Sequence, residues 1–210
     1  MAGTSRTGGR ALRIYLVRHG QSEWQLAPGA DLDMPLSPLG QEQSQRLADW
    51  CARGELLDAS SRFDVGPILV SPLKRARQTA DHLVRDLGLP VDTLPALAEA
   101  PFRVADELPR TTGPLTLPTG ESSERYRSFQ QQVGDALTEL VRLATESHRP
   151  VLAVTHGGVI KTALRTIAGS DAFSATLYNC GITAVDWRDG RWHVVHVNLW
   201  DHLPPRMRTL

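Results

Sequence analysis

Cysteine is scarce in this chain, since only Cys51 and Cys180 occur among its 210 residues. So low a count excludes a small secreted domain held together by several disulfides. Cys51 falls in a helical pattern and Cys180 in a loop far along the chain. We therefore expect both thiols to be reduced and the protein to be cytoplasmic.

Long apolar segments are absent as well. No stretch is apolar for long enough to span a bilayer. The first ten residues are rich in Ser, Thr, Gly and Arg and contain no apolar run, so we do not expect them to be a signal peptide. We expect residues 1–10 to be a flexible tail, and no membrane to be a partner.

Neither sign of charge is in excess, because 23 Lys and Arg residues balance 23 Asp and Glu residues. Proteins that bind nucleic acid usually show a basic excess, so nucleic acid is not an expected partner. A local basic pocket for a small anion is compatible with this balance. The length and the hydrophobic content of 41% predict one domain over residues 11–203, followed by a C-terminal tail at 204–210.

Short apolar segments alternate with helical patterns along the chain. The predicted strands lie at residues 12–17, 67–70, 151–155, 182–187 and 192–197, and the predicted helices at 38–51, 72–87, 121–146 and 157–167. Ser37-Pro38 and Ser71-Pro72 are typical helix starts, and Gly88 is a typical helix end. Asp189-Gly190 favours a hairpin between the last two strands.

This alternation predicts an α/β fold. We expect a three-layer α/β/α sandwich with a mainly parallel central sheet and an antiparallel hairpin at its C-terminal edge. Residues 90–120 hold six prolines and show little periodicity. We expect that segment to be a long connection that lies over the sheet.

Chemically active side chains follow three of the predicted strands directly. The first strand is followed by Arg18-His19-Gly20, the second by Ser71 and then Arg75, and the third by His156-Gly157-Gly158. The carboxyl ends of parallel strands meet at one edge of a sheet, which brings these groups together. Two arginines, two histidines and a helix N-terminus suit a phosphate group.

These segments resemble the motifs of the histidine phosphatase superfamily, which includes the cofactor-dependent phosphoglycerate mutases. The resemblance rests on the Arg-His-Gly motif at 18–20, the Ser-Pro-Leu-Lys-Arg motif at 71–75 and the Thr-His-Gly-Gly motif at 155–158. The segment Leu-Ser-Pro-Leu-Gly at 36–40 also resembles the start of the family's first helix. The match covers roughly residues 12–198, nearly the whole domain.

The resemblance implies a phosphohistidine mechanism. His19 would attack phosphorus, while Arg18, Arg75 and His156 would hold the phosphate oxygens. Glu99, in the Leu-Ala-Glu segment at 97–99, would act as general acid and then as general base. The implied phosphate and substrate contacts are Arg18, Gly20, Ser22, Gln25, Arg75, His156 and Gly157.

The chain departs from the family's common pattern in two places. Gln25 stands where the family often has Asn, and Glu99 is followed by Ala-Pro instead of an aromatic-Gly turn. Asp106, Glu107 and Glu121 therefore remain alternative acids. We expect bound phosphate to raise the pKa of Glu99, and the neighbouring arginines to keep His19 neutral. The histidines without motif context are interpreted as structural, namely His82, His148, His193, His196 and His202.

The expected activity is hydrolysis of a phosphomonoester on a small phosphorylated metabolite, with no metal and no cofactor. A phosphoglycerate mutase is the first alternative, and a non-catalytic module that binds a phosphate ligand is the second. A metal site with His19 and His156 as ligands is the chemical rival, although no HExxH motif or pair of cysteines accompanies them. A homodimer stays open as an alternative to the monomer.

Overall fold

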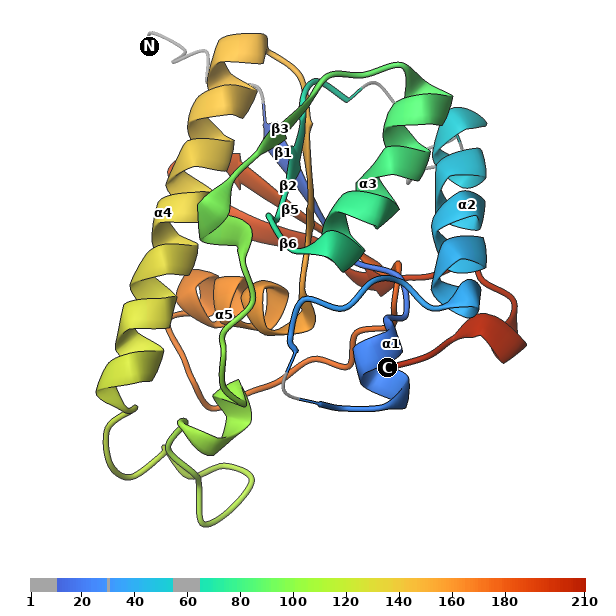
Figure 1. Ribbon diagram of the computed structural model, residues 1–210. Helices are drawn as coiled ribbons and strands as arrows, with labels where there is room; N and C mark the ends of the chain where they lie inside the picture. The colour runs from blue at the N-terminus through green and yellow to red at the C-terminus, as the bar shows by residue number, and fades with distance from the viewer. Residues whose placement is uncertain (1–10, 30, 55–64) are drawn as a thin grey trace, which may run out of the picture.

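The computed structural model describes residues 11–29, 31–54 and 65–210 (Figure 1). The predicted tail at 1–10 lies outside the described residues. A six-stranded sheet runs through the molecule in the order β3-β2-β4-β1-β5-β6. The strands are β1 (Leu12–Arg18), β2 (Ile68–Val70), β3 (Val91–Thr93), β4 (Val151–Thr155), β5 (Ile182–Arg188) and β6 (Arg191–Leu199).

Pairing within the sheet confirms the predicted fold class. Strands β3, β2, β4 and β1 are parallel to one another, whereas β5 is antiparallel to β1 and β6 is antiparallel to β5. The last two strands form the expected edge hairpin. Asp189 and Gly190 at its turn have φ values of 52° and 71°, as a two-residue turn of this kind requires.

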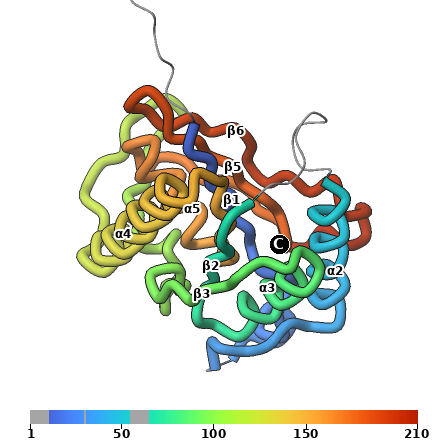
Figure 2. The backbone as a smooth tube through the Cα atoms, turned by 90° about the horizontal axis from the view of Figure 1, so that it is seen from above, coloured from blue at the N-terminus to red at the C-terminus, as the bar shows by residue number. Residues whose placement is uncertain are grey.

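Helices cover both faces of the sheet (Figure 2). On one face lie α2 (Pro38–Ala52) and α3 (Lys74–Leu87), and on the other lie α4 (Glu124–Ser147) and α5 (Gly157–Ala168). Strand β1 divides its side chains between the two cores. Ile14 and Leu16 join the core beneath α4 and α5, while Tyr15 and Val17 join the core beneath α2 and α3. Because both faces of this central strand are buried, its sequence is a continuous apolar run.

Helix ends follow the local sequence signals at several points. Ser37 caps α2, because its side chain accepts a hydrogen bond from the Gly40 N–H at 3.1 Å and Pro38 takes the first helical position. Gly88 ends α3 with a left-handed φ of 64°. Ser123 caps α4, which begins at Glu124 rather than at the predicted residue 121.

The predicted helix start at Ser71-Pro72 is wrong. Helix α3 begins at Lys74, and its N-cap residue, Leu73, makes no side-chain capping bond. The Ser71 hydroxyl lies instead 2.7 Å from His156 Nε2. A serine at a strand end can cap the next helix or bond a side chain nearby. Here His156, the first residue after the neighbouring strand β4, takes up the Ser71 hydroxyl.

The proline-rich connection contains more structure than the sequence predicts. Residues 91–93 form β3, an edge strand whose three side chains are all exposed, so it carries no apolar alternation. Short 3₁₀ turns follow at Pro95–Leu97 and Val104–Asp106.

A second element that the sequence did not predict lies outside this connection. It is a four-residue helix, α1 (Glu23–Leu26), between β1 and α2.

The segment 204–210, expected as a tail, lies against the domain. It contains a 3₁₀ turn at Pro205–Met207, and Met207 is only 2% exposed. The Asn179 N–H donates to the Thr209 carbonyl at 2.9 Å. This packing brings the end of the chain next to the loop that follows β1.

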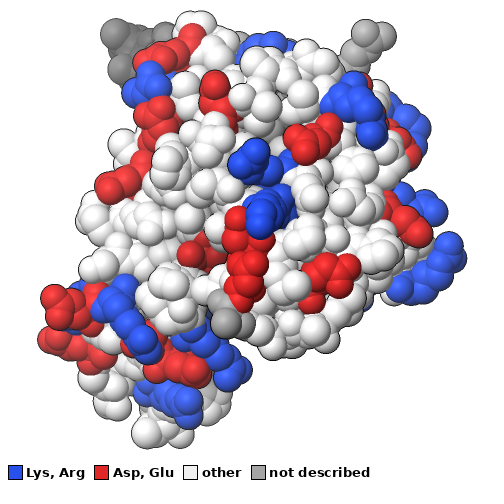
Figure 3. Space-filling model, viewed as in Figure 1, with Lys and Arg blue, Asp and Glu red and all other residues white. Residues whose placement is uncertain are grey.

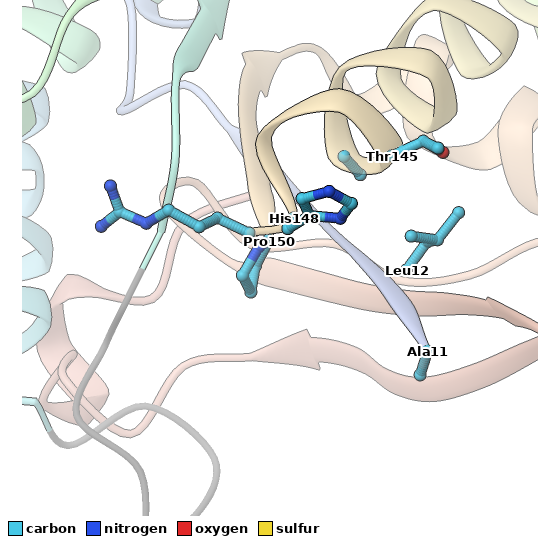
Figure 4. A pocket seen from close by; sticks show the side chains of 7 residues that line it. Ala11, Leu12, Thr145, His148 and Pro150 are labelled. Carbon is cyan, nitrogen blue, oxygen red and sulfur yellow. The ribbon is translucent and has the colours of Figure 1, made fainter. Parts of the chain in front are cut away.

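Both cysteines are buried and unpaired, in agreement with the prediction. Burial raises the pKa of the Cys180 thiol to about 12. Across the part of the chain that the structure describes, no helix combines the length and the apolar character that a membrane crossing needs. On the face seen in Figure 3, cationic and anionic side chains are interspersed.

Two leucines differ sharply in burial. Leu140 on α4 is 1% exposed, whereas Leu115 is 98% exposed. We expect Leu140→Ala to lower the free energy of unfolding by about 2–5 kcal/mol, because it leaves a cavity in the core. The control Leu115→Ala should change it by less than about 0.5 kcal/mol. Urea denaturation of both variants tests this difference, and equal effects would contradict the assigned core.

Candidate active site

Strand register brings the predicted site residues to one edge of the sheet. Arg18 at the end of β1 pairs with Thr155 at the end of β4, and Val70 at the end of β2 pairs with Val154. The ladder extends one step further, because His19 N–H donates to the Thr155 carbonyl at 2.9 Å. The first residues after the three strands therefore lie side by side.

His19 is almost fully buried, with 5% of its surface exposed. Its Nδ1 lies 2.6 Å from the Gly20 carbonyl oxygen, which can only accept a hydrogen bond, so Nδ1 carries the proton. The Arg75 Nε–H donates to His19 Nε2 at 3.2 Å. Both contacts assign the tautomer whose lone pair is on Nε2, the nitrogen that faces the arginine.

The surroundings of His19 keep its ring neutral. Burial lowers its pKa well below the usual value, and the positive charges of Arg18 and Arg75 lower it further. The ring therefore stays uncharged at neutral pH, and Nε2 keeps the lone pair that a nucleophile requires.

His156 lies beside His19, with ring centroids 5.0 Å apart. Its Nε2 is 2.7 Å from the Ser71 hydroxyl, while its buried Nδ1 has no partner among the described residues. Burial lowers the pKa of His156 well below the usual value, and nearby His19 and the arginines add to the effect. A second neutral imidazole therefore faces the first.

The two arginines are held by backbone carbonyls. Arg18 Nη1 donates to the Leu177 carbonyl and Arg75 Nη1 donates to the Leu32 carbonyl, both at 2.5 Å. Arg18 Nε is buried and has no partner among the described residues. Burial lowers the pKa of Arg18 to about 10, so it stays charged at neutral pH. Neither guanidinium has a carboxylate salt bridge within the described part of the chain.

Glu99 lies at the N-terminus of α5, next to these cations. Its Oε2 accepts a hydrogen bond from Gly158 N–H at 2.9 Å, and its Oε1 accepts one from Ala100 N–H at 3.1 Å. Burial raises the pKa of Glu99, although both N–H groups and both arginines oppose that shift. The carboxyl group is thus biased toward its protonated form.

The alternative acids stand apart from this cluster. Glu107 pairs with Arg125, which lowers the pKa of the carboxyl to about 2 and keeps it ionised. Asp106 pairs with Arg103, and Glu121 is highly exposed near Arg127. None of these carboxylates makes a hydrogen bond to a residue of the site within the described residues, so the geometry favours Glu99.

Of the four remaining predicted contact residues, Gly157 lies in the site, while Gly20, Ser22 and Gln25 contact other parts of the protein. Gly157 lies against Arg18, since a Cβ there would be 3.5 Å from Arg18 Nε. Gly20 is needed for close packing, because its Cβ would meet the Gly40 carbonyl at 2.5 Å. The amide oxygen of Gln25 accepts hydrogen bonds from the N–H and hydroxyl of Ser22. Gln25 Nε2 donates to Asn179 Oδ1 and to the Leu210 carbonyl, so the protein itself already engages the side chains of Ser22 and Gln25.

Three supporting residues have contacts that the sequence analysis did not assign. The Ser71 hydroxyl lies within hydrogen-bond distance of His156, Gly158 N–H donates to Glu99, and Asn179 Nδ2 donates to the His19 carbonyl at 3.0 Å. Ser71 and Gly158 stand inside the quoted motifs, which was the available signal. Asn179 lies in a loop without any sequence pattern. Among the described residues, no three His, Cys, Asp or Glu side chains are grouped so as to hold a metal ion.

Gly158 leaves the space that the Glu99 carboxyl occupies. A Cβ at this position would lie 2.2 Å from Glu99 Oε1, whereas a Cβ at Gly134 on α4 would meet nothing within 4 Å. Gly134→Ala should therefore stabilise the protein by about 0.5–1 kcal/mol. We expect Gly158→Ala to give no such gain and to displace Glu99. Urea denaturation and a crystal structure of the variant test this. An undisturbed Glu99 in Gly158→Ala would contradict the assigned contact.

Comparison with known proteins agrees with this geometry. The chain is 24% identical to the uncharacterized phosphatase PhoE of Bacillus subtilis over 196 residues, which covers 90% of this chain and 96% of the relative. It is 28% identical to the probable phosphoglycerate mutase GpmB of Proteus mirabilis over 201 residues, covering 86% of this chain and 87% of that protein.

Solved structures share the fold. Phosphoserine phosphatase from Entamoeba histolytica, in complex with phosphoserine, aligns with a TM-score of 0.68 and 24% identity, over 91% of this chain and 99% of the other. Mycobacterial glucosyl-3-phosphoglycerate phosphatase aligns with a TM-score of 0.66 and 24% identity, over 89% and 99%. The family model of the histidine phosphatase superfamily (branch 1) matches residues 14–199. The predicted resemblance is therefore confirmed, and the chain belongs to this superfamily.

Proposed function

We propose that this protein hydrolyses a phosphomonoester on a small metabolite through a phosphohistidine at His19. The observation that carries the proposal is the state of His19: a buried neutral ring with its Nε2 lone pair beside the Arg75 guanidinium. A phosphate dianion placed there would accept hydrogen bonds from Arg18, Arg75 and His156. Its phosphorus would then face the nucleophilic nitrogen.

In the first step, His19 Nε2 attacks phosphorus in line and the bond to the leaving oxygen breaks. The arginines hold the equatorial oxygens, on which charge is spread. Glu99 donates its proton to the departing alkoxide, and the raised pKa of its carboxyl favours the protonated form that this step needs. In the second step, the Glu99 carboxylate removes a proton from water, which attacks phosphohistidine and releases inorganic phosphate.

The named relatives support a phosphatase or a mutase, and we favour the phosphatase. PhoE and the two structural relatives bear phosphatase names, and their chains match nearly end to end with this one. A mutase of the kind named by GpmB remains the second candidate. It would transfer the phosphoryl group to a substrate hydroxyl instead of to water. The two buried free thiols support action in a reducing compartment such as the cytoplasm.

The deciding experiment incubates the purified protein with 3-phosphoglycerate and a panel of other phosphorylated metabolites. Release of inorganic phosphate supports the hydrolase, while conversion to 2-phosphoglycerate without release supports the mutase. Acid-labile labelling of the protein by a ³²P-labelled substrate would report phosphohistidine. Activity that EDTA abolishes and a divalent metal restores would overturn the metal-free mechanism. Absence of turnover on every ester would favour a phosphate-binding module.

Removal of the nucleophile should abolish turnover. We expect His19→Ala to lower kcat by at least about 10³-fold and to eliminate the acid-labile label. The control His193→Ala, which changes a histidine on the β6 edge strand, should leave kcat within about twofold. Steady-state kinetics on an aryl phosphate measures both. A labelled His19→Ala protein would remove the nucleophile assignment.

The pH dependence of the activity should report the protonation state of the Glu99 carboxyl. Its carboxyl must be protonated in the first step, so activity should fall as pH rises through its raised pKa, while the lowered pKa of His19 puts the acidic limb well below pH 6.5. We expect Glu99→Gln to lower kcat by about 10²–10⁴-fold and to lose the alkaline limb. An activated leaving group should recover part of the first step. The matched variant Glu107→Gln should keep the wild-type profile, and the reverse pattern would reassign the acid.

A further inference from the structure

The tautomer of His19 depends on one peptide group. The carbonyl of Gly20 accepts the Nδ1–H of His19 at 2.6 Å, and the N–H of the same peptide, at Gln21, donates to Gln43 Oε1 at 2.8 Å. A trans peptide is planar, and its N–H and C=O point in opposite directions. Holding the N–H therefore aims the carbonyl at the imidazole.

The orientation of the Gln43 amide is itself determined by its partners. Gln43 is completely buried on α2, and its Nε2 donates to the Met207 carbonyl at 2.6 Å and to the Thr209 hydroxyl at 2.9 Å. The Thr209 hydroxyl donates its own proton to Asn179 Oδ1 at 2.9 Å, so it accepts from Gln43. Both the Met207 carbonyl and the Thr209 hydroxyl must accept a hydrogen bond here, so the NH₂ group of Gln43 faces them. The amide oxygen of Gln43 therefore faces the Gln21 N–H.

We propose that Gln43 is a positioning residue that holds His19 in its Nδ1–H tautomer, with residues 207–209 fixing the Gln43 amide. The proposal rests on the proposed role of His19 as nucleophile. A proton on Nε2 would occupy the lone pair that must attack phosphorus. The bond from Nδ1 to the Gly20 carbonyl opposes that tautomer.

Arg75 cannot take over this task during catalysis. In the structure its Nε–H also favours a lone pair on His19 Nε2. When a phosphate is bound, the same guanidinium turns its donors to the phosphate oxygens, according to the function proposed above. The Gly20 carbonyl then remains as the group that selects the tautomer at the moment of attack.

A merely structural role for Gln43 predicts a different result. Its hydrogen bonds join β1, α2 and the segment 204–210, so losing them would lower stability in either case. Only the positioning role predicts that the proton on the His19 ring moves. The tautomer is visible by ¹⁵N NMR, because protonated and unprotonated ring nitrogens resonate far apart. This readout needs no turnover.

The main test compares Gln43→Met with Gln45→Met, which makes the same change two residues away on α2, where the side chain is only partly buried. His19 resonances are identified by their loss in His19→Ala. The tautomer is measured in saturating inorganic phosphate, which under the proposed function engages the donors of Arg75 and removes its influence on His19 Nε2. We expect Gln43→Met to populate the Nε2–H tautomer under these conditions and to lower kcat on an aryl phosphate at least tenfold, with a smaller change in KM. Gln45→Met should behave as wild type. A pure Nδ1–H tautomer in phosphate-saturated Gln43→Met would overturn the proposal, whatever the activity.

A second pair of variants serves if Gln43→Met does not fold. Thr209→Val keeps the shape of the side chain and removes the hydroxyl, while Thr209→Ser keeps the hydroxyl. We expect the tautomer mixture and a loss of kcat in Thr209→Val and recovery of both in Thr209→Ser. Equal tautomer populations in the two variants would contradict the proposed link. If the wild type forms no phosphohistidine, the proposed function fails, yet the tautomer measurement still decides the role of Gln43.

Discussion

The alignment of three parallel strand ends is the constraint on which the site depends. Hydrogen bonds carry the ladder beyond the strands, from His19 N–H to the Thr155 carbonyl and from Ser71 N–H to the Val154 carbonyl. A slip of one residue between β1 and β4 would turn one of the two imidazoles to the opposite face of the sheet. Backbone pairing therefore places the two histidines side by side, and their side-chain hydrogen bonds then orient the rings, whose centroids lie 5.0 Å apart.

Electrostatics then gives these groups their chemical character. Within the residues that the structure describes, Arg18 and Arg75 donate to carbonyl oxygens and form no salt bridge with a carboxylate, so no ion pair neutralises their positive charge. Glu99 is the carboxyl that interacts most strongly with both arginines, and burial biases it toward the neutral acid. If Glu99 were fully ionised, it would offset part of the field that attracts a phosphate dianion. Under the proposed mechanism, protonation of Glu99 would have two effects. It would supply the proton for the leaving group, and it would leave the cations free to bind oxygen.

Buried cations without carboxylate partners cost stability, and the two cores offset that cost. Arg75 is only 8% exposed, and both imidazoles are almost fully buried in uncharged form. The apolar clusters on the two sides of the sheet fix the strands that carry these groups. A bound dianion would pair with the arginines and return part of the desolvation cost, so the site is more stable with ligand than without it.

The sequence predicted those parts of the fold that depend on local patterns. Apolar runs identified β1, β2 and β4, and the residues directly after them formed the candidate site. The sequence did not predict strand β3, because all of its side chains are exposed and give no apolar pattern. Pairing with β2 holds this strand in the sheet. The role of Gln25 could not be read either. Its amide reaches Asn179 and Leu210, and nothing in the local sequence links residues more than 150 positions apart.

Two sets of contacts therefore hold the loop after β1. The sheet register places His19 beside the neighbouring strand end. Hydrogen bonds from Gln43, Asn179 and residues 207–209 support the loop from its other side. The second set is held mainly by hydrogen bonds, with Met207 as the buried apolar anchor of the final segment. If His19 is the nucleophile and Gln43 positions it, the geometry of the reacting nitrogen depends on hydrogen bonds that reach residues 207–209 as well as on the sheet register. Local opening of that final segment would then disturb the nucleophile while the sheet stays intact.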